Sequence, residues 1–297
     1  FGFDKQPFSL TPNTTFYCGF PEHQAALNTL LFSLRSGAGF IKIIGEVGSG
    51  KTLLCRMLLN SFSDDYAVAY IPNPDLDAYM LRKAFAKELG VEISPADDAS
   101  EVLHKLEQRL IALAAQDKKV VLVIDEAQAL PDDTLEALRL LNNLETESAK
   151  LFQIALFAQP EFDERLNLYS FRQLKQRIVF SHYLRPLLKA EVSEYVHHRL
   201  VKAGSIHPQL FSKQACDLLY KNSKGIPRII NVLCHKALLS AFGRGELKIG
   251  RQDVLAAIND GAQVVRSNQK WVNFGLLLIV SVLTIVFSVE LLRWVRI

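Results

Sequence analysis

Cysteine is scarce in this sequence, and its few copies lie far apart. No two cysteines form a Cys-x-x-Cys pair, since the four of them are Cys18, Cys55, Cys216 and Cys234. This spacing argues against a disulfide framework or a cysteine zinc site, and it favours free thiols in a reducing compartment. Histidine offers no metal site either, because His197 and His198 are adjacent and would face different directions on a helix.

The sequence also lacks a strong charge of one sign, internal repeats and low-complexity tracts. Its net charge of +3 is too small to indicate a nucleic-acid or membrane-surface partner by itself. Asp4, Lys5 and Pro7 interrupt the first residues before any apolar run develops, so we expect no secretory signal there. The composition, 49% hydrophobic and 22% charged over 297 residues, is that of an ordinary globular protein with one large or two modest domains.

Short apolar runs alternate with helical-period stretches through the first part of the chain, residues 1–186. Continuous apolar strands separated by helices predict a parallel sheet covered on both faces, and therefore an α/β nucleotide-binding domain. The predicted strands are residues 40–44, 67–71, 120–124, 152–157 and 178–184. The stretches of helical period include residues 51–62, 76–89, 100–115 and 132–147.

The character of the chain changes after this domain. Residues 187–265 contain only helical-period segments separated by Gly or Pro, which predicts a small α-helical domain. A polar linker, residues 266–270, leads to a hydrophobic segment over 271–293. As a helix this segment would be about 30 Å long, so it predicts a C-terminal transmembrane helix with tryptophans near both ends. A buried core helix is the alternative, but such helices are rarely apolar all round.

The stretch GEVGSGKT satisfies the pattern Gly-x4-Gly-Lys-Ser/Thr of a phosphate-binding loop. It stands between a predicted strand and a predicted helix, which is the context that a phosphate loop requires. The alternative interpretation is an ordinary glycine turn, which needs no such context. Lys51 would reach the β- and γ-phosphates, and the Thr52 hydroxyl would bind Mg²⁺. The predicted nucleotide-binding residues are Gly45, Glu46, Val47, Gly48, Ser49, Gly50, Lys51, Thr52 and Leu53.

A pair of acidic residues follows the predicted strand in VVLVIDEAQAL. Asp125 is placed to hold Mg²⁺, and Glu126 to orient and deprotonate the attacking water. Alone, two such carboxylates would be read as the solvated start of a helix. Together with the phosphate loop they predict hydrolysis of ATP with Mg²⁺ as the cofactor.

Several segments spread over residues 1–260 then combine in one pattern. They read FGFDKQPFSLTPNTTFY, GEVGSGKT, VVLVIDEAQ, FAQPEF, RQLKQRI and GIPRIIN. Together these segments resemble the ExeA/GspA-type AAA+ ATPases, which are membrane-linked ATPases of bacterial secretion and pilus systems. The resemblance implies an AAA+ P-loop NTPase core with a parallel sheet, and it implies that the small helical domain is a lid.

The resemblance also implies roles for individual residues. Gln159 matches sensor 1, which contacts the γ-phosphate or the attacking water, and Arg228 matches sensor 2 in the lid. Arg177 matches an arginine finger that acts on a neighbouring subunit, with Arg172 as a weaker candidate. Phe8 matches the apolar lead-in beside the adenine base. The alternatives are a loop glutamine, solvated surface arginines and simple core packing of Phe8.

Secretion-linked members of this group continue past the membrane span into a peptidoglycan-binding domain. The sequence ends shortly after Trp294, so the expectation is a short form that most resembles the MshM-type ATPases associated with MSHA-type type IV pilus biogenesis. A type II secretion assembly ATPase is one alternative, favoured if the chain is truncated. A nucleotide-dependent scaffold with negligible hydrolysis is another, and the intact acidic pair argues against it.

A DNA-handling AAA+ ATPase of the transposition-regulator type is a further alternative. It would carry a basic helix-turn-helix or stripe after the lid, which the sequence lacks, so nucleic acid is not expected as a partner. Because ATP is cytoplasmic, residues 1–265 are expected in the cytoplasm, and the span would cross the bacterial inner membrane. A finger acting in trans implies a ring-type homo-oligomer. The other expected partners are pilus or secretion assembly proteins and the lipid bilayer.

Overall fold

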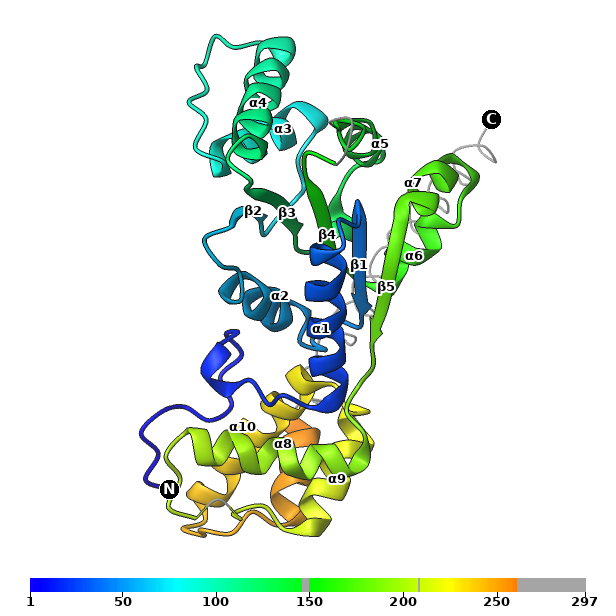
Figure 1. Cartoon of the computed structure of the whole chain (residues 1–297). Helices are drawn as coiled ribbons and strands as arrows, with labels where there is room; N and C mark the ends of the chain where they lie inside the picture. Colours follow the sequence, from blue (N-terminus) through cyan, green and yellow to red (C-terminus); the bar gives the residue numbers. More distant parts are fainter. Residues whose placement is uncertain (146–149, 208, 261–297) are drawn as a thin grey trace, which may run out of the picture.

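The computed structural model describes residues 1–145, 150–207 and 209–260, and a parallel β-sheet lies at its centre (Figure 1). The sheet has five strands in the order β2-β3-β4-β1-β5, and all neighbouring strands pair in parallel. The strands are β1 (Phe40–Gly45), β2 (Tyr66–Ile71), β3 (Lys119–Ile124), β4 (Gln153–Ala158) and β5 (Ile178–Leu184). The predicted parallel sheet is confirmed.

Helices cover both faces of the sheet, as strands that are apolar on both sides require. Alternate residues of β1 enter opposite cores, Phe40 and Ile44 on one side and Ile41 and Ile43 on the other. The core around Ile41 is completed by α1 (Pro21–Arg35) and α2 (Lys51–Asn60). The opposite core is completed by α3 (Ala78–Glu88), α4 (Ala99–Ala114), α5 (Asp132–Leu141), α6 (Pro160–Leu166) and α7 (Arg172–Arg177).

Local polar contacts decide where two of these helices begin or end. α4 begins after Asp98, whose carboxylate accepts the Glu101 N–H at 2.9 Å while the Glu101 side chain accepts the Asp98 N–H, a capping box. The helix predicted over 132–147 is shorter than expected, because α5 ends just before Asn142. The buried Asn142 side chain donates to the Phe152 carbonyl at 3.2 Å, which ties the turn after α5 to the start of β4.

A second domain, all helical, follows β5 (Figure 1), and we refer to it by the name that the resemblance implies, the lid. The first residues of the chain pack along it: Phe8 and Phe20 belong to its core, and Arg199 donates to the Pro7 carbonyl at 2.6 Å. The lead-in that the sequence grouped with the α/β domain therefore contacts the lid as well. The lid consists of α8 (Lys189–Lys202), α9 (Lys213–Ser223), α10 (Pro227–Gly243) and a further helical segment over 251–260.

Within the part of the chain that the structure describes, no helix is both long enough and apolar enough to cross a membrane. The linker predicted at 266–270 and the span predicted at 271–293 lie outside the described residues.

Candidate nucleotide-binding site

The phosphate loop joins the carboxyl end of β1, an interior strand of the sheet, to the start of α2. Gly45 ends β1 and α2 begins at Lys51, so the loop lies at the N-terminus of a helix. Gly48 and Gly50 have φ values of +80° and +107°, which favour glycine over any other residue. The Ser49 N–H donates to the Glu46 carbonyl at 3.1 Å and closes the turn. This geometry turns backbone N–H groups and the positive end of the helix toward an anion.

Lys51 lies inside this loop with its ammonium group held by carbonyl oxygens. Its side chain is 4% exposed, and Nζ donates to the carbonyls of Gly45 and Glu46 at 2.8 and 3.1 Å. Burial lowers the pKa of Lys51, while the negative charges of Glu126, Asp125 and Glu46 oppose the shift. The ammonium therefore faces both predicted acidic residues across the site.

Asp125 follows β3 and meets Thr52 from the first turn of α2. It is 2% exposed, and its carboxylate accepts hydrogen bonds from the Thr52 hydroxyl and from the Glu126 N–H, the latter at 3.0 Å. Burial raises the pKa of Asp125, and these two hydrogen bonds partly offset the shift. A hydroxyl and a carboxylate at this position are oxygen donors of the kind that Mg²⁺ uses beside the phosphates of a nucleotide. The donor set therefore fits Mg²⁺ on Thr52 and Asp125.

Glu126 adopts a left-handed backbone conformation, with φ of +53°, that is uncommon outside glycine and is frequent at functional sites. Its carboxylate accepts the side-chain N–H groups of Gln159 at 2.9 Å and of Gln128 at 2.5 Å. Burial raises the pKa of Glu126, but these hydrogen bonds and the Lys51 charge outweigh it and hold the pKa below its ordinary value. The structure thus places an ionised carboxylate next to Gln159, the residue that matches sensor 1.

Arg228 reaches the phosphate loop from the lid. It stands in the first turn of α10, and its backbone N–H donates to the Gly48 carbonyl at 3.2 Å. The approach is so close that a Cβ on Gly48 would lie 2.5 Å from the Cβ of Arg228. Gly225 permits the preceding turn, because its φ is +78° and a Cβ there would lie 2.0 Å from the Leu187 carbonyl oxygen. The lid therefore contacts the loop directly at Arg228.

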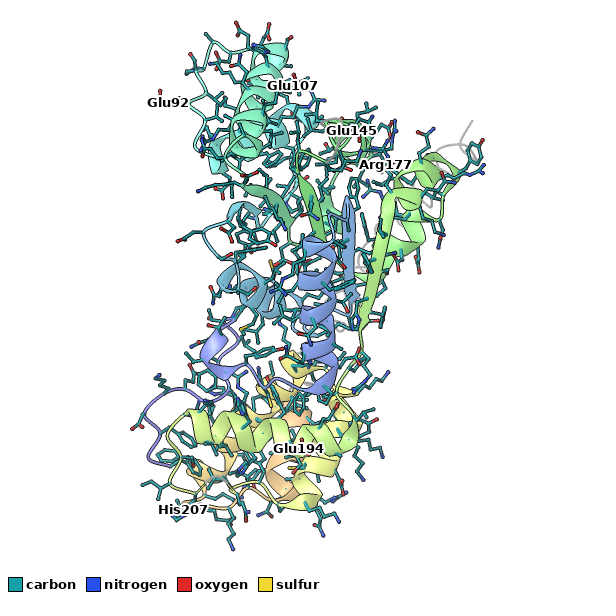
Figure 2. All side chains as sticks on the ribbon, in the orientation of Figure 1. Glu92, Glu107, Glu145, Arg177, Glu194 and His207 are labelled. Carbon is teal, nitrogen blue, oxygen red and sulfur yellow. The ribbon has the colours of Figure 1, made fainter. Side chains whose placement is uncertain are left out.

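Arg177 lies at the opposite end of the sheet from the phosphate loop. β1 and β5 pair in parallel from Phe40 opposite Ile178 to Gly45 opposite Leu184, so the residue before β5 is far from the loop after β1. Figure 2 shows Arg177 near Glu145, at the end of the molecule away from the lid. Its guanidinium donates to the Arg139 carbonyl at 2.7 Å. Arg177 therefore cannot act on the phosphate loop of its own subunit, and Arg172 is exposed at the start of the same short helix.

Phe8 lies in the core of the lid rather than on the surface of the site. It is 2% exposed and packs edge-on against Phe211 with ring centroids 5.9 Å apart. Core packing, the alternative interpretation of this residue, accounts for that position. In the phosphate loop, Val47 and Glu46 are exposed, and Leu53 is half-buried on α2.

Two residues near the site had not been assigned from the sequence. His23, on α1, is 8% exposed, and its side chain hydrogen-bonds to the backbone of Ser49 in the phosphate loop. Burial lowers the pKa of His23, and the contact with Ser49 partly offsets this. Gln128 contacts both Glu126 and Gln159. Neither residue belongs to the phosphate-loop pattern or the acidic pair, although Gln128 stands in the family-like segment VVLVIDEAQ.

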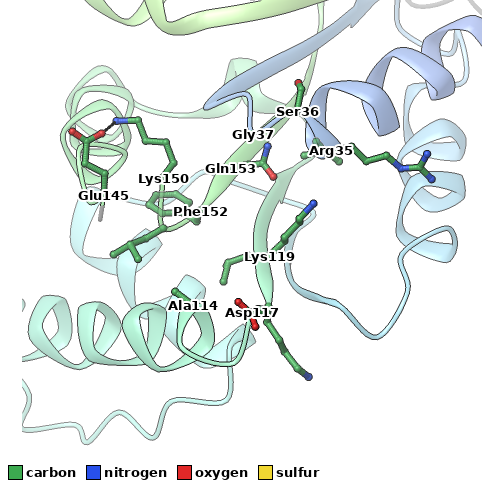
Figure 3. A pocket seen from close by; sticks show the side chains of 14 residues that line it. Arg35, Ser36, Gly37, Ala114, Asp117, Lys119, Glu145, Lys150, Phe152 and Gln153 are labelled. Atoms are coloured by element: carbon green, nitrogen blue, oxygen red, sulfur yellow. Dashed lines mark hydrogen bonds and ion pairs between the residues drawn. The ribbon is translucent and has the colours of Figure 1, made fainter. Parts of the chain in front are cut away.

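A separate hollow of about 680 Å³ lies at the other edge of the sheet (Figure 3). It is lined by residues before β1 and around the starts of β3 and β4, among them Arg35, Lys119 and Gln153. Lys150 and Glu145 form an ion pair at its rim. Because the phosphate loop follows the carboxyl end of β1, this hollow is distinct from the nucleotide site.

The sequence is similar to known proteins of the class that a phosphate loop of this geometry indicates. Residues 34–166 match the family model described as an AAA domain. The chain is 39% identical over 257 residues to general secretion pathway protein A of Aeromonas hydrophila, an alignment that covers 86% of this chain and 47% of that protein. The chain thus spans about half the length of this curated relative.

Solved structures with the same fold include proteins of archaeal and eukaryotic origin. CDC6P from Pyrobaculum aerophilum matches with a TM-score of 0.66 at 16% identity, over 83% of this chain and 70% of that one. The Aeropyrum pernix ORC2 protein matches with a TM-score of 0.61 at 18% identity, over 84% and 72% of the two chains. At these identities the likeness concerns the fold alone. Residues 34–166 are therefore similar to an AAA domain, the chain has an α/β P-loop fold with a parallel sheet, and its sequence is similar to general secretion pathway protein A.

Proposed function

We propose that this chain binds ATP with Mg²⁺ and hydrolyses it to ADP and phosphate. The observation that carries the proposal is the convergence of three strand ends on one site. Lys51 and Thr52 follow β1, Asp125 and Glu126 follow β3, and Gln159 follows β4. Hydrogen bonds join Thr52 to Asp125 and Gln159 to Glu126, so these residues form one continuous polar site.

Each of these residues has a defined task in this reaction. The loop N–H groups and the Lys51 ammonium bind the phosphates and neutralise their charge. Thr52 and Asp125 would hold Mg²⁺, which supplies positive charge at the β- and γ-phosphates. Glu126 accepts a proton from the attacking water, and Gln159, held 2.9 Å from that carboxylate, orients the water toward the γ-phosphate.

We also propose that a second subunit completes the site. Arg177 lies far from its own phosphate loop, on the short helix before β5, where it could reach the γ-phosphate bound by a neighbour. Arg228 would act from within the same subunit, because the lid contacts the loop at Gly48. An arginine supplied in trans requires at least a dimer and is compatible with a ring.

The proposed biological role is assembly of a bacterial envelope machine, supported by the similarity to general secretion pathway protein A. Within that class we propose an MSHA-type type IV pilus system of the MshM type, with type II secretion as the second candidate. The hydrophobic segment 271–293 would anchor the chain in the inner membrane, with the ATPase domain in the cytoplasm. The proposed anchor is supported by the hydrophobic composition of this segment, and the proposed pilus role rests on the resemblance.

The enzymatic part is tested by ATP turnover of the purified chain and of Lys51→Ala. Turnover that is abolished in Lys51→Ala supports the proposal, and a chain that neither binds nor hydrolyses ATP contradicts it. Stimulation by duplex DNA at physiological salt would instead favour the DNA-handling alternative. Proteins of the same fold were solved with DNA, among them Drosophila ORC, with a TM-score of 0.63 at 19% identity.

The cellular role needs separate experiments. Deletion of the gene should abolish surface pili while secretion of exoproteins continues, and the reverse result would favour type II secretion. The anchor is tested by fractionation: the full chain should require detergent for extraction from membranes, whereas a chain ending at Gln263 should not. Equal extraction of both without detergent would contradict the anchor.

A further inference from the structure

Gln128 makes two side-chain contacts in the proposed hydrolytic site that sequence motifs do not assign. Its Nε2 donates to the Glu126 carboxylate at 2.5 Å, and its Oε1 accepts the backbone N–H of Gln159 at 3.1 Å. Gln159 in turn donates from its own side chain to the same Glu126 oxygen at 2.9 Å. The three residues therefore form a closed triangle of hydrogen bonds between the end of β3 and the end of β4.

The backbone around Gln128 is held independently of these contacts. Gln128 is the middle residue of η2 (Ala127–Ala129), a short 3₁₀ turn whose N-cap is Glu126. The Ala129 N–H donates to the Glu126 carbonyl at 2.9 Å, and Arg165 donates to the Gln128 carbonyl at 3.3 Å. Arg165 also forms an ion pair with Asp132 at the start of α5. The amide side chain of Gln128 thus extends from a turn whose backbone is fixed by these hydrogen bonds.

We propose that Gln128 is a positioning residue that fixes the Glu126 carboxylate beside Gln159, so that both groups act on the same water. Only a primary amide of this length satisfies both contacts, since one end must donate to a carboxylate and the other must accept from a backbone N–H. The left-handed backbone of Glu126 does not by itself fix where its carboxylate points, and loss of geometry at a general base is costly even without loss of binding. The inference rests on the proposed ATP hydrolysis by this site.

The test compares kcat with nucleotide affinity in Gln128→Glu and Gln128→Ala, using the full chain and a fluorescent ATP analogue for binding. Gln128→Glu keeps the length of the side chain and the acceptor for Gln159, but it removes the donor and places a like charge beside Glu126. We expect kcat to fall at least tenfold in both variants. The Kd should stay within twofold, because neither contact of Gln128 involves the phosphate loop.

The matched control is Gln252→Glu, the same substitution at an exposed position on the last described helix of the lid. It should leave kcat and Kd unchanged, and thermal melting of all variants reports whether the fold persists. A fall in kcat of less than tenfold overturns the inference. A rise in kcat also overturns it, because the contact would then restrain Glu126 rather than position it.

A parallel loss of affinity and kcat would likewise overturn it, since Gln128 would then act through binding or folding. If Gln128→Ala does not fold, Gln128→Glu carries the test, because it preserves the shape of the side chain. If the unaltered chain has no turnover, the proposed function fails instead, so failure of the two proposals is distinguishable.

Discussion

The backbone N–H of Arg228 donates to the carbonyl of Gly48 at 3.2 Å, so the lid and the phosphate loop are in direct contact. A Cβ added to Gly48 would lie 2.5 Å from the Cβ of Arg228, closer than side-chain atoms can approach. The loop and the lid are therefore packed without space between them at this point. A substitution that enlarges the side chain at Gly48 would therefore displace either the loop or the start of α10.

Gly48→Ala should separate this contact from ordinary backbone strain. Both Gly48 and Gly37 have φ of +80°, but a Cβ at Gly37 would meet nothing within 4 Å. Gly37→Ala should therefore cost about 1–2 kcal/mol of stability and leave ATP affinity unchanged. Gly48→Ala should lose more stability and at least tenfold in ATP affinity, measured by thermal melting and by titration with a fluorescent analogue. Equal effects of the two variants would show that the contact with Arg228 contributes nothing.

Arg177→Ala should reduce kcat without weakening ATP binding, because Arg177 is remote from the loop of its own subunit. Arginine fingers contribute a factor of about 10³–10⁵ to kcat. Arg172, the weaker candidate for the finger, is exposed on the same short helix, and Arg172→Ala should retain activity if Arg177 is the finger.

The trans geometry of Arg177 is tested by mixing two inactive variants. In a mixture of Arg177→Ala and Glu126→Gln subunits, an intact Glu126 can face an intact Arg177 across an interface. Partial recovery of turnover is expected. A mixture that remains inactive while the subunits still assemble would exclude Arg177 as a finger.

His23 should make stability fall in mild acid. Burial lowers the pKa of His23 in the folded chain below the ordinary value of about 6.5, so below that pH the unfolded chain binds a proton that the folded chain does not. Stability is therefore full above about pH 6.5 and declines as the pH falls toward the lowered pKa. The melting temperature of the unaltered chain should decline over this window more steeply than that of His23→Gln. His104→Gln, at an exposed position, should behave like the unaltered chain. Identical profiles for all three would contradict the prediction.

The sheet was predictable from the sequence because continuous apolar strands alternate with helices. The runs around Ile43, Val121 and Leu156 are apolar on both faces of the strand, and this pattern indicates a parallel sheet that is covered by helices on both sides. The acidic pair after its apolar strand predicted Asp125 at the site with the phosphate loop, whereas Gln159 was expected there only through the resemblance. The sequence does not predict their hydrogen-bonding partners.

The remaining features depend on packing that no local pattern encodes. His23 contacts the loop only because α1 and α2 share one face of the sheet, and nothing in PEHQAAL marks that contact. Gln128 turns back to Glu126 because η2 is a tight 3₁₀ turn, whereas the sequence there indicated no particular turn. Phe8 was expected from the resemblance to lie beside the adenine base, and the structure adds that its ring packs in the lid core.

Glu126→Gln is the measurement that tests the central claim most directly. The substitution removes the proposed proton acceptor but keeps the size of the side chain, so ATP should bind with a Kd within twofold of the unaltered value. Turnover should fall by about 10²–10⁴, the contribution of a general base. Glu164→Gln, at an exposed position on α6, serves as the control and should hydrolyse ATP normally. Turnover in Glu126→Gln equal to that of the unaltered chain would contradict the assignment of this site as the hydrolytic centre.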